Sequence, residues 1–293
     1  MASGNYSSAM LVFLAALLCH LLCCRLDGST VLVASETTSS YPIRVVPFIH
    51  VAKKYFHTRF LASRNTWLNC TPPWADVFLF NLVKEGPAPG PYETILIDTE
   101  EYGHNSNVQF FKTLEILYNR YKKTHTAEAL KHTWYLKLDD DAYVHWPGLY
   151  AALYGLTASL PAESNLPLYY GNCNCKTGPH VCKQDKYINC TLIGNMPPFE
   201  YICGGSGILF NHEMVRVLLD YELSVGCPYS LEDITIGHCV KELSRSRQHP
   251  VQCTNDYQHF KTLNNYEHVR HYDQVRHDPA VLGKCMCPVY VHM

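Results

Sequence analysis

The sequence predicts an α/β fold in which a mostly parallel sheet is flanked by helices on both faces. Short apolar runs bounded by Pro and Gly alternate with longer segments whose apolar residues recur at helical spacing. This alternation is typical of parallel strands joined by crossover helices. The chain has 293 residues, of which 47% are apolar and 17% charged, enough for a substantial core. The formal net charge is only −2, and scattered Lys and Arg give no basic surface, which argues against nucleic acid as a partner.

The first half of the chain supplies most of the predicted elements. The segment "IRVVPFIHVAKKYFHTRFLASRNTWLN" predicts a strand followed by a helix whose apolar face is interrupted by polar residues. "ADVFLFNL" and "YETILIDTE" predict two buried strands, and "KEGPAPGP" predicts the loop between them. In "NVQFFKTLEILYNRYKK" the residues Phe110, Leu114, Leu117 and Tyr118 lie at helical spacing before terminal lysines, which indicates a helix.

The second half alternates regular and irregular segments. "TWYLKL" predicts the next strand, which three aspartates close. Residues 161–198 are rich in Cys, Pro, Gly and Asn and predict an irregular region tied by disulfides. "YICGGSGILFN" predicts a glycine-rich bend leading into a strand, and "SLEDITIGHCV" predicts the start of a helix.

The amino-terminal segment predicts entry into the secretory pathway. We divide the chain into a short tail (1–8), an apolar run (9–24), a linker rich in small polar residues (25–42) and the main domain (43–293). The run is short for a membrane span and long enough for a signal-peptide core, so a signal-anchor and a cleaved signal both remain open. The absence of Lys and Arg before the run, with Arg25 after it, argues against an anchor with a cytoplasmic amino terminus.

The cysteines indicate an oxidising compartment. Of fourteen, eleven follow the apolar run, and this odd number predicts at least one thiol that is free or forms a disulfide-linked dimer. The alternative is a zinc site, because four cysteines lie close together in the sequence: Cys173, Cys175, Cys182 and Cys190. This cluster, however, has no pair of cysteines with the two-residue gap of a zinc knuckle.

Two sequons, "NCT" at Asn69 and again at Asn189, fit luminal loops that could carry N-linked glycans. Each is a short pattern that also arises by chance.

The aspartate triplet predicts a metal site. Ligands of open α/β sheets bind outside the carboxyl ends of the strands, where Asp139, Asp140 and Asp141 should lie. Three adjacent carboxylates repel one another unless a positive charge neutralises them, and hard divalent cations bind carboxylate oxygens. Side-chain alternation predicts Asp139 and Asp141 on one side and Asp140 on the other. The alternative is a solvated turn, although apolar and aromatic residues resume directly after the triplet.

Two further motifs carry chemistry only in combination. The glycine-rich bend, with Gly204, Gly205 and Gly207, lets the backbone turn tightly and approach a ligand. Such a bend has a purely structural role at least as often. Glu232 and Asp233 begin the predicted helix, where acids are common because they favour the helix dipole. The functional alternative is that one of them is a general base.

Three motifs follow one another along the chain: an apolar strand ending in Asp-Asp-Asp, then Gly-Gly-Ser-Gly, then Glu-Asp with a Gly four residues after the Asp. In this order they resemble the fringe-like and core 1 synthase-like β1,3-glycosyltransferases of glycosyltransferase family 31. Upstream, "KKYFHTRFLASRNTW" resembles the fringe donor-site segment. The resemblance covers roughly residues 44–265. It implies the GT-A architecture, in which a nucleotide-binding sheet is joined to an acceptor-binding half, and dependence on manganese.

For the donor side, the resemblance implies that Asp141 ligates the metal, while Asp139 and Asp140 hold metal-bound water and the ribose or sugar of the donor. Arg59 would contact the UDP. Gly204 and Gly205 belong to the same donor-binding set.

For the remaining site residues, the resemblance implies that Asp233 deprotonates the acceptor hydroxyl. A second metal ligand is assigned to His259, in "DYQHFKTLNN", although the local pattern departs from fringe and other histidines lie nearby. Cys227 and Cys239 bracket the Glu-Asp motif as cysteines do in core 1 synthase, which implies a disulfide that would hold the helix bearing the base.

The implied function is an inverting, manganese-dependent transfer of a hexose or N-acetylhexosamine from a UDP-sugar to a hydroxyl of a glycan or glycoprotein acceptor, forming a β1,3 linkage. The implied location is the Golgi or endoplasmic reticulum lumen, as a type II membrane protein or secreted after signal cleavage. The alternative is a catalytically silent relative acting as a chaperone or glycan-binding protein, but such relatives lose the acid triplet. A calcium-stabilised binding domain would need a cage of carboxylates instead.

Overall fold

The structure is a computed structural model. It describes residues 42–52, 55–80, 91–97, 106–160, 165–177, 199–227, 231–246, 251 and 253–256. Several predicted features lie outside these residues: the apolar run 9–24, the loop segment 84–90, Cys182, Asn189, Cys190 and His259. Within the described ranges, none of the helices combines the length and apolar character that a membrane span requires.

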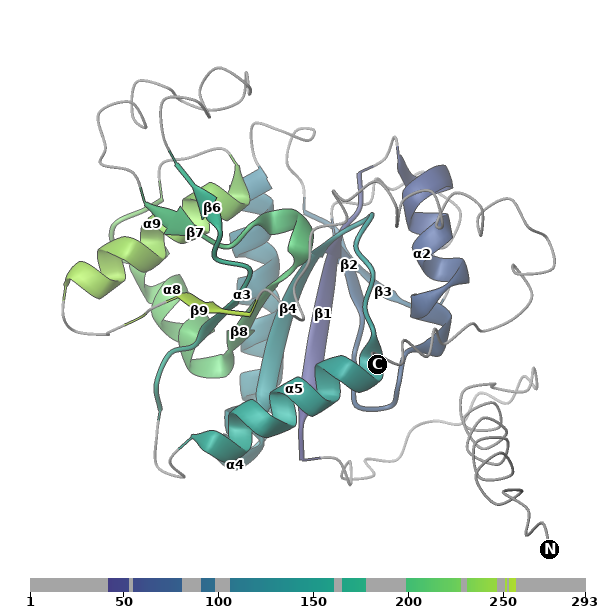
Figure 1. The fold of residues 1–293 in the computed structure, drawn as a ribbon, viewed down its shortest axis with the longest axis horizontal. Coiled ribbons are helices and arrows are strands. Elements are labelled where there is room, and N and C mark those ends of the chain that lie inside the picture. The colour runs from purple at the N-terminus through teal and green to yellow at the C-terminus, as the bar shows by residue number, and fades with distance from the viewer. Residues whose placement is uncertain are drawn as a thin grey trace, which may run out of the picture.

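A seven-stranded sheet in the order β3-β2-β1-β4-β8-β5-β9 forms the centre of the described chain (Figure 1). Its strands are β1 (Arg44–His50), β2 (Phe78–Phe80), β3 (Glu93–Ile95), β4 (Thr133–Asp139), β5 (Tyr169–Gly171), β8 (Ile208–Asn211) and β9 (Cys253–Asn255). Neighbouring strands pair in parallel except β8, which runs antiparallel to β4 and to β5. The prediction of a mostly parallel sheet is therefore confirmed.

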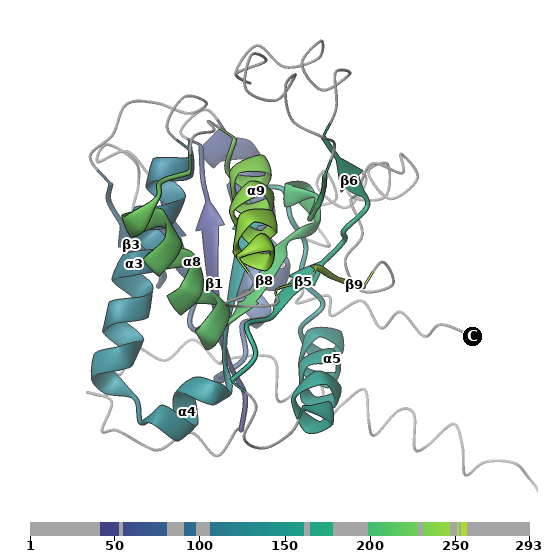
Figure 2. The same cartoon turned by 90° about the vertical axis from the view of Figure 1, so that its left-hand side faces the viewer.

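Helices cover both faces of the sheet, as predicted, with one hydrophobic cluster on each face. On one face lie α3 (Ser106–Thr124), α8 (His212–Ser224) and α9 (Glu232–Arg245). On the other lie the π-helical turn η2 (Phe56–Phe60), α2 (Leu61–Asn65), the 3₁₀ turn η3 (Trp67–Cys70) and α5 (Trp146–Ser159). A short helix, α4 (Ala127–Lys131), precedes β4. Figures 1 and 2 show α3, α8 and α9 grouped on one side of β1 and β4.

The two central strands explain why the sheet forms where the sequence predicts it. Strand β1 alternates its side chains between the two faces, with Val46 and Phe48 in one cluster and Val45 and Ile49 in the other. Both sets are buried because helices cover both faces, so the strand reads as a continuous apolar run. Strand β4 pairs with β1 in register up to the pair His50 and Asp139, so both strands end together at one edge.

The prediction for the middle segment was partly wrong. Within residues expected to be irregular, Tyr169–Gly171 form β5 inside the main sheet, and β6 (Cys175–Lys176) pairs with β7 (Glu200–Tyr201). A strand of three residues is too short to show a period in the sequence. Its hydrogen-bonding partners β8 and β9 come from distant parts of the chain, so only the tertiary fold makes it a strand.

Three disulfides tie the described part of the chain, which confirms the prediction that these cysteines are oxidised. Cys227–Cys239, the pair implied by the family resemblance, lies across the start of α9. Cys173–Cys253 joins the chain after β5 to β9. Cys175–Cys203 joins β6 to the glycine-rich bend. The zinc alternative is wrong for Cys173 and Cys175, because both are disulfide-bonded.

Candidate active site

The acid triplet lies at the carboxyl end of the central strand β4, but its side chains do not alternate as predicted. The strand ends at Asp139, and the backbone turns at Asp140 and Asp141, with the Ala142 amide donating to the Asp139 carbonyl at 3.1 Å. The turn ends the strand alternation. Asp140 and Asp141 consequently share one partner, Arg59, whereas Asp139 contacts a different group.

Asp140 is a buried carboxylate held by the chain after β1. The Ala52 amide donates to its Oδ2 at 3.3 Å, and the Ser63 hydroxyl donates to its backbone carbonyl at 3.1 Å. Burial, followed by repulsion from Asp141, raises its pKa to about 6, although the Ala52 hydrogen bond and Arg59 act in the opposite direction. A positive ligand placed beside this carboxyl would lower its pKa again, which is the behaviour expected of a cation-binding edge.

Arg59 supplies the exposed positive charge of the site. A guanidinium nitrogen lies 2.9 Å from Oδ2 of Asp141 and 3.6 Å from Oδ1 of Asp140, and the group stacks on the Tyr55 ring with its carbon 4.0 Å from the centroid. The side chains of Arg59 and Asp141 are 43% and 48% exposed. Solvent or a ligand can therefore reach both, and the ion pair is an exchangeable one.

The described residues fit a divalent cation that would be held mainly by phosphates of the bound substrate, with few ligands from the protein. Asp141 offers an exposed carboxylate, and hard cations of nucleotide sites use few carboxylates together with substrate phosphates and water. Asp141 belongs to no cluster of three metal-ligand side chains among the described residues. His259, the other expected ligand, lies outside them.

A buried ion-pair cluster lies next to the triplet. Nζ of Lys137 is 2.6 Å from Oδ1 of Asp139 and 2.7 Å from Oε1 of Glu232, and Nδ1 of His50 is 3.7 Å from the same Glu232 oxygen. Burial alone would raise the pKa of Glu232, but Lys137 and then His50 hold that pKa well below its usual range. The two carboxylates keep Lys137 charged despite its complete burial and raise its pKa.

Sequence reasoning missed this cluster, although one signal was present. Lys137 interrupts an apolar strand two positions before Asp139, which places both side chains on the same face. A buried lysine requires a charged partner, so the pairing with Asp139 could have been inferred. The second partner, Glu232, could not, because it comes from a helix almost a hundred positions later in the chain.

The glycine-rich bend lies beside the triplet because β8 is antiparallel. Lys137 near the end of β4 pairs with Ile208 at the start of β8, so the preceding 3₁₀ turn η4 (Gly204–Ser206) lies at the carboxyl end of β4. The Gly204 amide faces Asp233, whereas Gly205 is exposed with no neighbour close to where a side chain would begin. The antiparallel pairing thus brings two separate sequence motifs to one edge.

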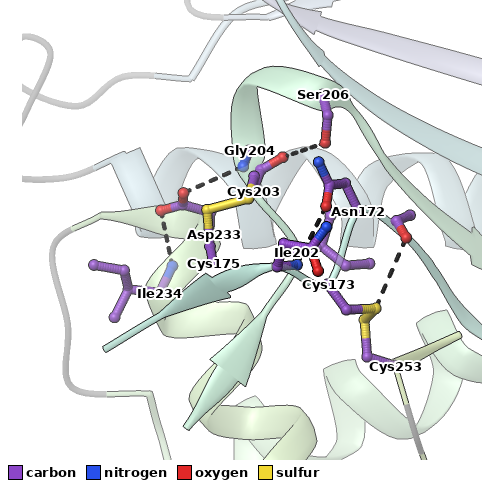
Figure 3. The surroundings of a disulfide bond; sticks show 12 residues. Asn172, Cys173, Cys175, Ile202, Cys203, Gly204, Ser206, Asp233, Ile234 and Cys253 are labelled. Carbon is purple, nitrogen blue, oxygen red and sulfur yellow. Dashed lines mark hydrogen bonds between the residues drawn. A yellow bond between two sulfur atoms is a disulfide. The ribbon is translucent and has the colours of Figure 1, made fainter. Parts of the chain in front are cut away.

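Asp233 occupies the second position of α9 and is mostly buried. Its Oδ2 accepts from the Gly204 amide at 3.3 Å and its Oδ1 from the Ile234 amide at 2.8 Å (Figure 3). Burial and then the charge of Glu232 raise its pKa to about 6, while Lys137 and the two amides act in the opposite direction. A carboxylate with this pKa is mostly ionised at neutral pH and can still accept a proton from a hydroxyl.

Two glycines, Gly204 and Gly237, allow neighbouring segments to lie close to α9. A Cβ on Gly204 would lie 3.1 Å from Oδ2 of Asp233, tighter than ordinary packing. A Cβ on Gly237, the glycine four positions after Asp233, would collide with the Cβ of Tyr201. The two glycines therefore let η4 and β7 pack directly against α9.

The chain matches the Fringe family model, described as Fringe-like, over residues 46–278. Among curated proteins, it is 24% identical over 226 residues to chondroitin sulfate synthase 3 of Homo sapiens, and 23% identical over 228 residues to that of Mus musculus. Each match covers 76% of this chain, which spans 23% of the length of each relative.

Among solved structures, the chain is similar to a glycosyltransferase involved in the glycosylation of the major capsid of PBCV-1. The two are 14% identical, with a TM-score of 0.33, and the match covers 73% of this chain and 83% of the other. The family match extends over most of the chain and includes the acid triplet, the glycine-rich bend and the helix that carries Asp233. The chain belongs to the Fringe-like family of glycosyltransferases.

Proposed function

We propose that the protein is an inverting, manganese-dependent glycosyltransferase that moves a hexose or N-acetylhexosamine from a UDP-sugar to a glycan hydroxyl, forming a β1,3 linkage. The observation that carries the proposal is Asp233, a mostly buried carboxylate whose pKa is about 6 at the edge where the acid triplet ends β4. A base with this pKa beside a cation-binding edge has the two components that glycosyl transfer from a nucleotide diphosphate requires.

On the donor side, Arg59 and the triplet receive the UDP-sugar. The Arg59 guanidinium, which now neutralises Asp141, turns to the diphosphate and thereby releases the Asp141 carboxylate. Asp141 and His259 would hold the manganese ion, which when bound offsets the negative charge that the departing diphosphate gains. Asp140 and the partly exposed carboxylate of Asp139 would help to hold metal-bound water and the ribose or sugar of the donor.

On the acceptor side, Asp233 acts as the general base. Its carboxylate takes the proton of the acceptor hydroxyl as that oxygen attacks the anomeric carbon from the face opposite UDP. The new carbon–oxygen bond forms while the bond to the UDP oxygen breaks, and the electron pair leaves with UDP. A single displacement inverts the anomeric configuration, so an α-linked donor gives a β-linked product.

Other observations support the proposed compartment and acceptor class. Three disulfides in the described chain are compatible with an oxidising lumen such as that of the Golgi or endoplasmic reticulum. The curated relatives are named as synthases of chondroitin sulfate, itself a glycan, which supports a glycan acceptor here.

The test is transfer and hydrolysis of a panel of UDP-sugars by the purified full-length chain, with manganese and with a chelator. Asp141→Asn should lose manganese-dependent turnover and UDP binding together. Asp233→Asn should keep UDP binding and lose turnover, because it removes the base and leaves Arg59 and Asp141 unchanged. Asp220→Asn is the matched control, since that carboxylate forms an exposed ion pair with Arg216 on α8. A wild-type chain that binds no UDP with any metal would refute the proposal and favour a silent family member.

A further inference from the structure

We infer that Lys137 is a positioning residue that holds the base-bearing end of α9 against the acid triplet of β4. The inference rests on the proposed function, because it assigns Lys137 a role in transfer through Asp233. Lys137 touches neither donor nor acceptor in this scheme. It acts by fixing the relative placement of the two halves of the site.

Lys137 joins two elements, β4 and α9, that are far apart in the sequence. Its fully buried ammonium contacts Asp139, the first residue of the triplet, at 2.6 Å and Glu232, the first residue of α9, at 2.7 Å. Glu232 directly precedes Asp233 in the chain. Any shift of the first turn of α9 relative to β4 must therefore lengthen one of two short, charge-assisted contacts.

This cluster would be taken for a metal site from its ligand types alone. Donor atoms of His50, Asp139 and Glu232 lie within 4.8 Å of one another. The Lys137 ammonium already lies within hydrogen-bonding distance of both carboxylates, and a divalent cation placed there would meet this fixed positive charge. The cation of this cluster is therefore the lysine, and the exposed carboxylate of Asp141 is left for a cation that arrives with the donor.

The start of α9 depends on such a contact because the helix lacks a side-chain cap. Its N-cap residue, Leu231, accepts no side-chain hydrogen bond from the first turn. The described contacts at or near this turn include the Lys137–Glu232 pair, the His50–Glu232 contact from β1, the hydrogen bond from Gly204 to Asp233, and the Cys227–Cys239 disulfide. Of these, only the Lys137–Glu232 pair connects the turn to the strand that carries the triplet.

The experiment compares Lys137→Met with the double variant Lys137→Met/Glu232→Gln in the full-length chain. For each we would measure kcat and KM for transfer, the Kd for UDP with manganese, and Tm. Lys122→Met, an exposed lysine on α3, controls for the loss of one positive charge. The double variant matters because the single variant leaves Glu232 buried without its cation and can lose stability for that reason alone.

The inference predicts a drop in kcat of roughly 100-fold in both variants, the effect expected of a displacement of about 1 Å at a reacting group. The Kd for UDP with manganese should change less than about 3-fold, because Arg59 and Asp141 are untouched, and Tm should recover in the double variant. Should the double variant regain kcat together with Tm, or should UDP binding fall in parallel with kcat, Lys137 would be merely structural and the inference would be overturned.

If Lys137→Met fails to fold, the double variant decides alone. A folded double variant with wild-type kcat contradicts the inference, and one with reduced kcat and intact UDP binding supports it. Failure of the proposed function is distinguishable, because the wild type and Lys122→Met would then both lack transfer, and the inference would fall with it.

Discussion

Replacing Asp233 by Asn should stabilise the fold at neutral pH while abolishing transfer. The pKa of Asp233 lies at about 6 in the folded chain against an ordinary value of 3.8. Between these values the native state binds more protons than the unfolded state, so stability falls as pH rises through this window. Above pH 6 the ionised carboxylate destabilises the fold by about 3 kcal/mol relative to its protonated form, because each pH unit between the folded and unfolded pKa values corresponds to about 1.4 kcal/mol.

The amide substitution recovers only part of this energy. Asp233 accepts from two backbone amides, those of Gly204 and Ile234, and an Asn side chain can accept from only one of them. The lost hydrogen bond offsets about 1 kcal/mol, so a net gain of about 1–2 kcal/mol remains. This gain corresponds to a rise in Tm of about 2–8 °C for a domain of this size.

The assay is differential scanning fluorimetry of wild type and Asp233→Asn from pH 4 to pH 8, alongside transfer at pH 7. The two melting curves should differ least near pH 4, where Asp233 is protonated in the folded chain and little of the unfavourable ionisation remains, and should separate as pH rises to 7. Turnover should fall by about 10²–10⁴, the range for loss of a general base. A variant that melts below wild type at pH 7, or that retains transfer, would refute the assignment of a strained, ionised base.

Further predictions address the same site and its surroundings. The acid limb of kcat/KM should have its midpoint near pH 6, because transfer requires ionised Asp233 and is lost as pH falls through that pKa; a midpoint near pH 4 would exclude this base. Replacing Cys227 and Cys239 by Ser should lower stability by about 2–3 kcal/mol in chemical denaturation, while an unchanged midpoint would show that the disulfide contributes little. Asn69 is exposed at the end of η3, so secreted or luminal protein should lose one glycan-sized mass step in Asn69→Gln on a denaturing gel, and an unshifted band would contradict the sequon.

Much of the fold could be predicted because its central strands are buried on both faces. Strand β1 is largely an apolar run, β4 is one interrupted only by Lys137, and α3 has a clear helical period, so their positions follow from local sequence alone. Strand β5 could not be predicted, since its three residues become a strand only through β8 and β9. Disulfide pairing likewise follows from the fold, and here only Cys227–Cys239 was implied in advance, by resemblance.

The sequence proposed a set of candidate site residues but could not give their arrangement. The triplet is of a residue type that can bind a cation, whereas the roles proposed for Arg59 and Asp233 came from the family resemblance, which the order of the motifs indicates. The sharing of Arg59 by Asp140 and Asp141 could not be foreseen, because it depends on where β4 ends and the turn begins. Side chains alternate between the two faces only within a strand, and the rule already fails at Asp140, the first residue after β4.

The two cations of the candidate site differ in burial, and this difference fits the roles that we propose for them. Lys137 is buried between Asp139 and Glu232, so its pairing persists whether or not a donor is bound. Arg59 is 43% exposed and pairs with a carboxylate that is itself 48% exposed, so water screens the pair and a diphosphate can displace it. A site that must admit and release a charged nucleotide needs its exchangeable cation at the surface and its fixed cation inside. Under the proposed roles, exchanging the two environments would leave the donor without a partner and the base without a fixed position.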